Sequence, residues 1–104
     1  MPTFVLTYRP PKDYKAGTPE GMAAWTAWFE SMGPALADIG KLVGESTVVG
    51  NCGSDVRALA GYSVIRADDL AAASSVAKGC PFVALGGGVE VGLLADLPGT
   101  PASS

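Results

Sequence analysis

The chain has 104 residues, of which 7 are basic and 10 are acidic, so its formal net charge is −3. This length corresponds to one domain; we expect residues 1–97 to form it and residues 98–104 to be a flexible C-terminal tail. The acidic balance argues against nucleic-acid binding, which needs a basic surface. Histidine is absent, which removes the commonest general base near neutral pH and the commonest metal ligand. We expect no metal and no other cofactor.

The N-terminus and the cysteines favour a cytoplasmic protein. Residues 1–9 lack the basic leader and apolar core of a secretory signal. No uninterrupted apolar run reaches the roughly 18 residues that a membrane span requires. Cys52 and Cys80 lie far apart and form no CxxC motif, so we expect two reduced thiols. The sequence therefore predicts no membrane partner.

The first strand and the first helix are predicted from different periodicities. Residues 3–9 alternate between two faces, as a half-buried strand does. Thr18 followed by proline and glutamate is typical of a helix start. One apolar stripe then repeats every three or four residues as far as residue 39, which predicts a helix kinked at Pro34 and ended by Gly40. The stripe consists of Met22, Trp25, Phe29, Met32, Leu36 and Ile39.

Three further strands and a second helix complete the predicted fold. Residues 41–49 form a weaker strand region, and residues 59–67 contain a clearly alternating strand. Asp68 is the expected N-cap of a helix over residues 69–78. Residues 89–94 alternate again after a glycine hinge. The order β-α-β-β-α-β predicts a ferredoxin-like α+β domain, in which two helices cover one face of an antiparallel four-stranded sheet.

The composition predicts that the second face of this sheet is also covered. The chain is 48% hydrophobic and only 16% charged. Val5, Val43, Ile65, Leu94 and their neighbours place apolar side chains on both faces. Because the helices cover only one face, we expect a second copy of the chain to cover the other, which gives a twofold homodimer.

Four segments together resemble a known family. They are MAAWTAWF at 22–29, LAGYSVIRADDL at 59–70, AKGCP at 77–81 and GVEV at 88–91. As a set, they are similar to the YCII-related (DGPF-domain) family, and the resemblance runs over nearly the whole ordered chain. It implies a ferredoxin-like fold and a dimeric α/β-barrel-type assembly with facing sheets.

The chain departs from that family in two ways. Some members carry a His-Asp pair in a cleft and are suspected enzymes, and one branch performs dehalogenation-type chemistry on an aromatic ring. This chain has no histidine, so the pair cannot exist. It also lacks the Asp-Gly-Pro-Phe motif, and residues 50–57 form a shorter loop in that neighbourhood. The resemblance therefore implies a fold, while the family's chemistry does not carry over.

Five aromatic side chains are candidates for a ligand pocket. Trp25, Trp28 and Phe29 lie within one helical turn, and Tyr8 and Tyr62 come from strands that can lie beneath them. They can wall an apolar pocket for a flat organic ligand, with hydroxyl or indole N–H groups as polar handles. Alternatively, Trp25 and Phe29 belong to the core, while Trp28, which is off the stripe, lies at the helix edge, in a cleft or at the dimer contact.

Cys80 and Glu90 are the remaining candidates. Cys80 follows a helix C-terminus, where the helix dipole disfavours a thiolate, so we expect a buried structural thiol beside the pocket. Glu90 lies among apolar neighbours and is the one weak catalytic candidate. In a dry cleft it can act as a general acid or base; alternatively, it forms an inert ion pair with Arg66 or Arg9.

Two functions follow from these expectations. The first is a dimeric binding or accessory domain with an aromatic-lined pocket for a small hydrophobic molecule and without catalysis. The alternative is a small cofactor-free lyase or isomerase, in which a carboxylate or a tyrosine moves a proton on a hydrophobic, aromatic substrate. The absence of a nucleophile–base pair favours the first function.

Overall fold

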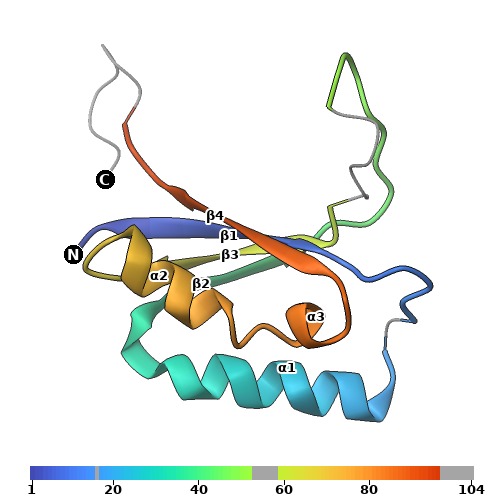
Figure 1. Ribbon diagram of the computed structural model, residues 1–104, viewed down its shortest axis with the longest axis horizontal. Coiled ribbons are helices and arrows are strands. Elements are labelled where there is room, and N and C mark those ends of the chain that lie inside the picture. The colour runs from blue at the N-terminus through green and yellow to red at the C-terminus, as the bar shows by residue number, and fades with distance from the viewer. Residues whose placement is uncertain (16, 53–58, 97–104) are drawn as a thin grey trace.

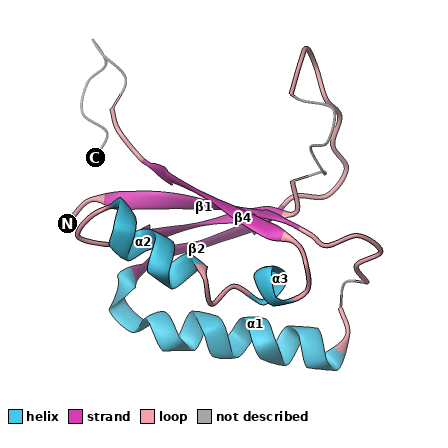
Figure 2. Cartoon of the chain, viewed as in Figure 1, coloured by secondary structure: helices cyan, strands magenta, loops and turns pink. Residues whose placement is uncertain are grey.

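The computed structural model describes residues 1–15, 17–52 and 59–96, which form a compact α+β fold. An antiparallel four-stranded sheet carries its helices on one face, and Figures 1 and 2 show the opposite face without a helix. The elements are β1 (Thr3–Arg9), α1 (Pro19–Met32), the short 3₁₀ helix η1 (Gly33–Ala35), β2 (Leu36–Leu42), β3 (Gly61–Arg66), α2 (Leu70–Ala77), α3 (Pro81–Ala84) and β4 (Gly88–Leu93). The predicted tail, residues 98–104, lies outside the described residues.

The first strand forms where the alternation predicts it and lies inside the sheet. The strand order is β2-β3-β1-β4, and β1 pairs antiparallel with both β3 and β4. Phe4, Leu6 and Tyr8 all point toward the helices and are no more than 5% exposed. Ile65 lies opposite Phe4 and is fully buried on the same face. This face, with the helices above it, forms the hydrophobic core.

Side-chain caps begin both longer helices. The hydroxyl of Thr18 accepts a hydrogen bond from the backbone N–H of Gly21 at 3.1 Å, as expected for the predicted start of α1. At α2 the carboxylate of Asp69 accepts from the N–H of Ala72 at 2.8 Å. The N-cap is therefore Asp69 and not the predicted Asp68, a shift of one residue.

The first helix ends earlier than predicted. It stops at Met32, where Gly33 adopts φ 54° and ψ −129° and donates its N–H to the carbonyl of Glu30. Pro34 follows, and a proline disfavours helical backbone in the residue before it. The prediction of one kinked helix to residue 39 is therefore wrong. The glycine–proline pair ends the helix, and the apolar residues after it continue as a strand.

The second strand occupies residues that were predicted to be helical. It runs over Leu36–Leu42 along the edge of the sheet and pairs antiparallel with β3. The predicted strand over residues 41–49 is wrong beyond its first two residues, since residues 43–52 form neither helix nor strand. A short apolar run fits helical and extended periodicities equally well, and the tertiary pairing decides between them.

Gly40, predicted to end a helix, lies instead at an irregularity of β2. Its φ is 78°, and a β-carbon there would overlap the carbonyl of Tyr62 on the neighbouring strand. The carboxylate of Asp38 accepts a hydrogen bond from the N–H of Gly40 at 2.9 Å. The hydroxyl of buried Ser63 donates to the carbonyl of Ile39 at 2.6 Å. These two bonds hold the strand where its ladder with β3 is shifted.

The chain after α2 makes one element that the sequence analysis did not predict. Pro81 was expected to terminate a helix, yet it begins the four-residue helix α3. Proline is favoured at the first helical position because that position needs no N–H donor.

Among the described residues, no helix is both long enough and apolar enough to cross a membrane.

Replacing Gly40 by alanine is expected to destabilise the fold. The substitution places a β-carbon against the Tyr62 carbonyl and forces a left-handed conformation that costs L-residues about 1–2 kcal/mol before any clash. Gly44→Ala is the control, because an added β-carbon there meets nothing within 4 Å. Chemical denaturation of the two variants measures the difference, and equal midpoints would contradict the assigned role of Gly40.

Candidate functional site

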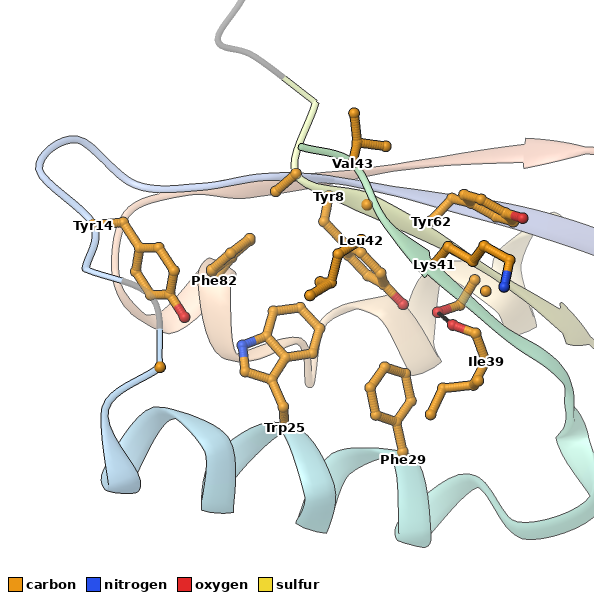
Figure 3. Close-up of a pocket in the computed structure, with 15 residues that line it drawn as sticks. Tyr8, Tyr14, Trp25, Phe29, Ile39, Lys41, Leu42, Val43, Tyr62 and Phe82 are labelled. Atoms are coloured by element: carbon orange, nitrogen blue, oxygen red, sulfur yellow. Dashed lines mark hydrogen bonds between the residues drawn. The ribbon is translucent and has the colours of Figure 1, made fainter. Parts of the chain in front are cut away.

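A cavity of about 490 Å³ lies between α1, α3 and the β2 end of the sheet (Figure 3). Its wall is mainly apolar, with side chains from both faces of the gap between helix and sheet. Ile39 and Leu42 of β2 are 57% and 92% exposed and stand at its mouth. The aromatic side chains of the wall are those of Tyr8, Tyr14, Trp25, Phe29 and Phe82. Tyr62 of β3 also borders the cavity, but its ring lies on the helix-free face of the sheet, the face of its partner Thr7.

The aromatic wall is held together by its own contacts. Trp25 lies edge-on to Tyr8 and to Phe82, with ring centroids 4.9 Å apart in both pairs. Tyr14 makes a similar contact with Phe82 at 4.7 Å, and Phe29 lies 5.7 Å from Trp25. Edge-to-face packing is the arrangement that the ring quadrupoles favour. The wall is therefore shaped without help from a ligand.

Trp28 belongs to the core and does not line the cavity. It is 8% exposed, and its indole Nε1 donates a hydrogen bond to the carbonyl of Val76 at 3.2 Å. Its ring lies behind that of Trp25, 5.5 Å away. The expectation of an edge, cleft or dimer position is therefore wrong. Trp28 and Met32 mark the buried centre of α1, whereas Met22, the first residue of the predicted stripe, is 61% exposed.

The hydroxyl of Tyr8 is a buried polar group at the cavity, beside that of Ser63. Tyr8 is 5% exposed, and its oxygen has no hydrogen-bond partner in the described part of the chain. The nearby hydroxyl of Ser63 donates elsewhere, to the carbonyl of Ile39. Burial raises the pKa of Tyr8 to about 12, an effect that Ser63 partly opposes and Cys80 slightly reinforces. At neutral pH this hydroxyl is therefore protonated and able to donate.

Cys80 is buried, as expected of a structural thiol, but it does not line the cavity. It is 1% exposed and forms no disulfide, whereas Cys52 is exposed and also forms none. Burial raises the pKa of the Cys80 thiol, and backbone hydrogen bonds from Phe82 and Val83 offset part of that effect. A thiol in this environment forms little of the thiolate that nucleophilic attack requires.

Glu90 lies away from the cavity. It is exposed and stands opposite Thr7 in the β1–β4 ladder, on the sheet face without helices. Arg66 stands opposite Thr3 of β1, four residues away, and its guanidinium donates to the carbonyl of Pro34 at 3.1 Å. Neither a dry cleft around Glu90 nor a cross-strand pair with Arg66 therefore forms. Tyr8, Trp25 and Phe29 are the predicted pocket residues whose side chains the structure brings together. Tyr62 borders the cavity, but its side chain lies on the helix-free face of the sheet.

The sequence analysis missed Tyr14, Phe82 and the β2 side of the cavity. Tyr14 is a single aromatic residue in an otherwise polar loop, which is a signal that it packs against something. Phe82 follows Pro81, whose predicted role was to end the preceding helix. Ile39 and Leu42 were missed because their segment was placed in the wrong elements.

The described residues contain no group of three or more side chains suited to hold a metal ion.

No family model, no curated protein and no solved structure matches this chain. The site is therefore interpreted from its own geometry. The resemblance to the YCII-related family remains a prediction from local motifs.

Because Tyr8 is buried as the neutral phenol, the stability of the protein should fall at alkaline pH. Below pH 10 the phenol is protonated in both the folded and the unfolded chain. Between pH 10 and 12 the unfolded chain loses this proton while the folded chain retains it, so the free energy of unfolding decreases. In Tyr8→Phe this part of the decrease should disappear. Denaturation at a series of pH values measures it, and equal slopes for the two proteins would contradict the buried phenol.

Proposed function

We propose that this protein is a small-molecule-binding domain that holds a flat, largely apolar ligand in the aromatic cavity. The observation that carries this proposal is the cavity, with its volume of about 490 Å³ and the aromatic side chains of Tyr8, Tyr14, Trp25, Phe29 and Phe82. Ligand pockets commonly enclose about 300–1,000 Å³ and are lined by apolar and aromatic groups with few polar ones. The edge-to-face contacts of the wall support a site that needs little rearrangement to bind.

The polar groups of the cavity favour binding over catalysis. Lys41 is the one charged side chain among its described lining residues, and it is exposed. A tyrosine with a pKa of about 12 is a poor base at neutral pH, and Glu90 lies on the other face of the sheet. The alternative proton-transfer enzyme would therefore need a base from outside this lining. For that reason we favour the binding function over the proton-transfer enzyme.

We also propose a ferredoxin-like topology for the fold. The element order and the strand order β2-β3-β1-β4 support it, with α3 as an addition before the last strand. Membership of the YCII-related family is part of the same proposal and rests on the four segments described above. A cytoplasmic location, inferred from the two free cysteines, remains a prediction.

The helix-free sheet face supports a homodimer as a further part of the proposal. Val5 lies on this face between Val64 and Gly92 of the neighbouring strands, and Leu94 is 44% exposed. The face also carries polar side chains, Glu90 among them, which suits the rim of an interface better than its centre. We propose that two copies meet over the valines.

Naphthalene binding tests the proposed pocket. We expect saturable binding to the native chain, and an affinity about tenfold lower for Phe29→Ala because that variant loses an aromatic wall. Met22→Ala is the matched control on the same helix, since Met22 is largely exposed outside the cavity. Saturation-transfer NMR and calorimetry give the affinities. Absence of saturable binding, or equal loss in both variants, would refute the pocket.

Sedimentation velocity tests the dimer. The native chain should sediment with twice the mass of one chain, and Val64→Glu should sediment as a single chain because it buries a charge at the proposed contact. Met22→Glu, on the helix side of the molecule, should leave the dimer intact. A native chain that sediments as a monomer at micromolar concentration would overturn this part of the proposal.

A further inference from the structure

The Tyr8 hydroxyl is polar, deeply buried and unpartnered among the described residues, in a cavity whose wall is mainly apolar. Only 5% of the residue is exposed, and its oxygen finds no hydrogen-bond partner among the described residues. An unpaired buried hydroxyl costs free energy, because it has given up its hydrogen bonds to water. Few buried polar groups in native structures lack a hydrogen-bond partner. A ligand that accepts a hydrogen bond from the Tyr8 hydroxyl would supply the missing partner.

The surroundings of Tyr8 determine the direction of that bond. The neighbouring Ser63 hydroxyl donates to the carbonyl of Ile39 at 2.6 Å, a bond that also holds the irregular part of β2. Burial disfavours the ionised phenol, so the oxygen keeps its proton. Tyr8 therefore has a proton to offer, and an acceptor on the ligand is the complementary group.

The walls determine the charge and shape of the ligand. Trp25 and Phe29 face Tyr8 from α1, and their ring faces favour a planar apolar partner. A buried carboxylate or phosphate would need a cation beside it. Among the described lining residues the one cation is Lys41, and it is exposed at the sheet edge. An uncharged acceptor, such as a carbonyl or a ring nitrogen, meets the requirements of the deep part of the cavity.

We propose, on the basis of the binding function above, that Tyr8 is the polar anchor of the cavity and that the ligand is a neutral, planar ring compound with a hydrogen-bond acceptor. The Tyr8 hydroxyl donates to that acceptor, while Trp25 and Phe29 enclose the rings. Specificity of this kind arises because an analogue without the acceptor leaves the buried hydroxyl unpaired.

A pair of isosteric probes isolates the hydrogen bond. Quinoline and naphthalene have nearly the same shape, but only quinoline carries a ring nitrogen, which is uncharged above neutral pH. The ratio of their dissociation constants is measured by calorimetry for the native chain and for Tyr8→Phe. Comparing ratios cancels the different cost of removing the two probes from water, as in a double-mutant cycle. Thr7→Val is the control, because it removes a hydroxyl from the same strand on the opposite face.

We expect Tyr8→Phe to weaken quinoline relative to naphthalene by roughly five- to tenfold, the effect of one hydrogen bond, and Thr7→Val to leave the ratio unchanged. An unchanged ratio in Tyr8→Phe, with both probes still bound, would overturn the anchor and leave the apolar pocket standing. Failure of both probes to bind the native chain would refute the proposed function and, with it, this inference. A thermal melt of each variant verifies that the fold is intact.

Discussion

The end of α1 at Gly33 and Pro34 is the constraint on which the rest of the structure depends. If the helix continued, residues 36–42 would pack as helix and the sheet would lose its edge strand β2. Because the chain turns there, β2 runs back along β3 and faces α1 across a gap. That gap is too wide for the aromatic side chains of α1 to fill, and it becomes the cavity. A local backbone preference thus determines where the cavity forms.

Much of the sheet was predictable, because β1 and β3 show a clear sequence alternation that matches burial on one face. β4 also forms close to where it was predicted, although its burial does not alternate. The cap at Thr18 was also visible, since capping is a local interaction between residues three apart. β2 was not predictable in the same way. Its apolar residues continue a helical spacing by coincidence, and only pairing with β3 decides its conformation. The same wrong assignment affected the predicted site. Its aromatic residues on β1 and α1 were predicted, whereas Ile39 and Leu42 of β2 were missed.

The positions of the two tryptophans illustrate a further limit of periodicity. Trp25 and Trp28 are one turn apart, and the apolar stripe includes only the first, yet the second is the more buried. The hydrogen bond from the Trp28 indole to the carbonyl of Val76 accounts for this burial, because it holds the indole between α1 and α2. Such a contact joins residues 48 positions apart and leaves no trace in local sequence. Trp25 makes no such bond between the helices and instead lines the cavity.

The irregular edge strand has a consequence for the behaviour of the protein in concentrated solution. A straight, regular edge invites strands of other molecules to pair with it and so begins aggregation. Here the shifted ladder of β2, with Asp38 and Lys41 beside the turn at Gly40, presents a bent and charged edge. The same distortion that shapes the mouth of the cavity thus protects an exposed border of the sheet. Regularising β2 would leave a straighter edge for other strands to pair with and would also reshape the cavity.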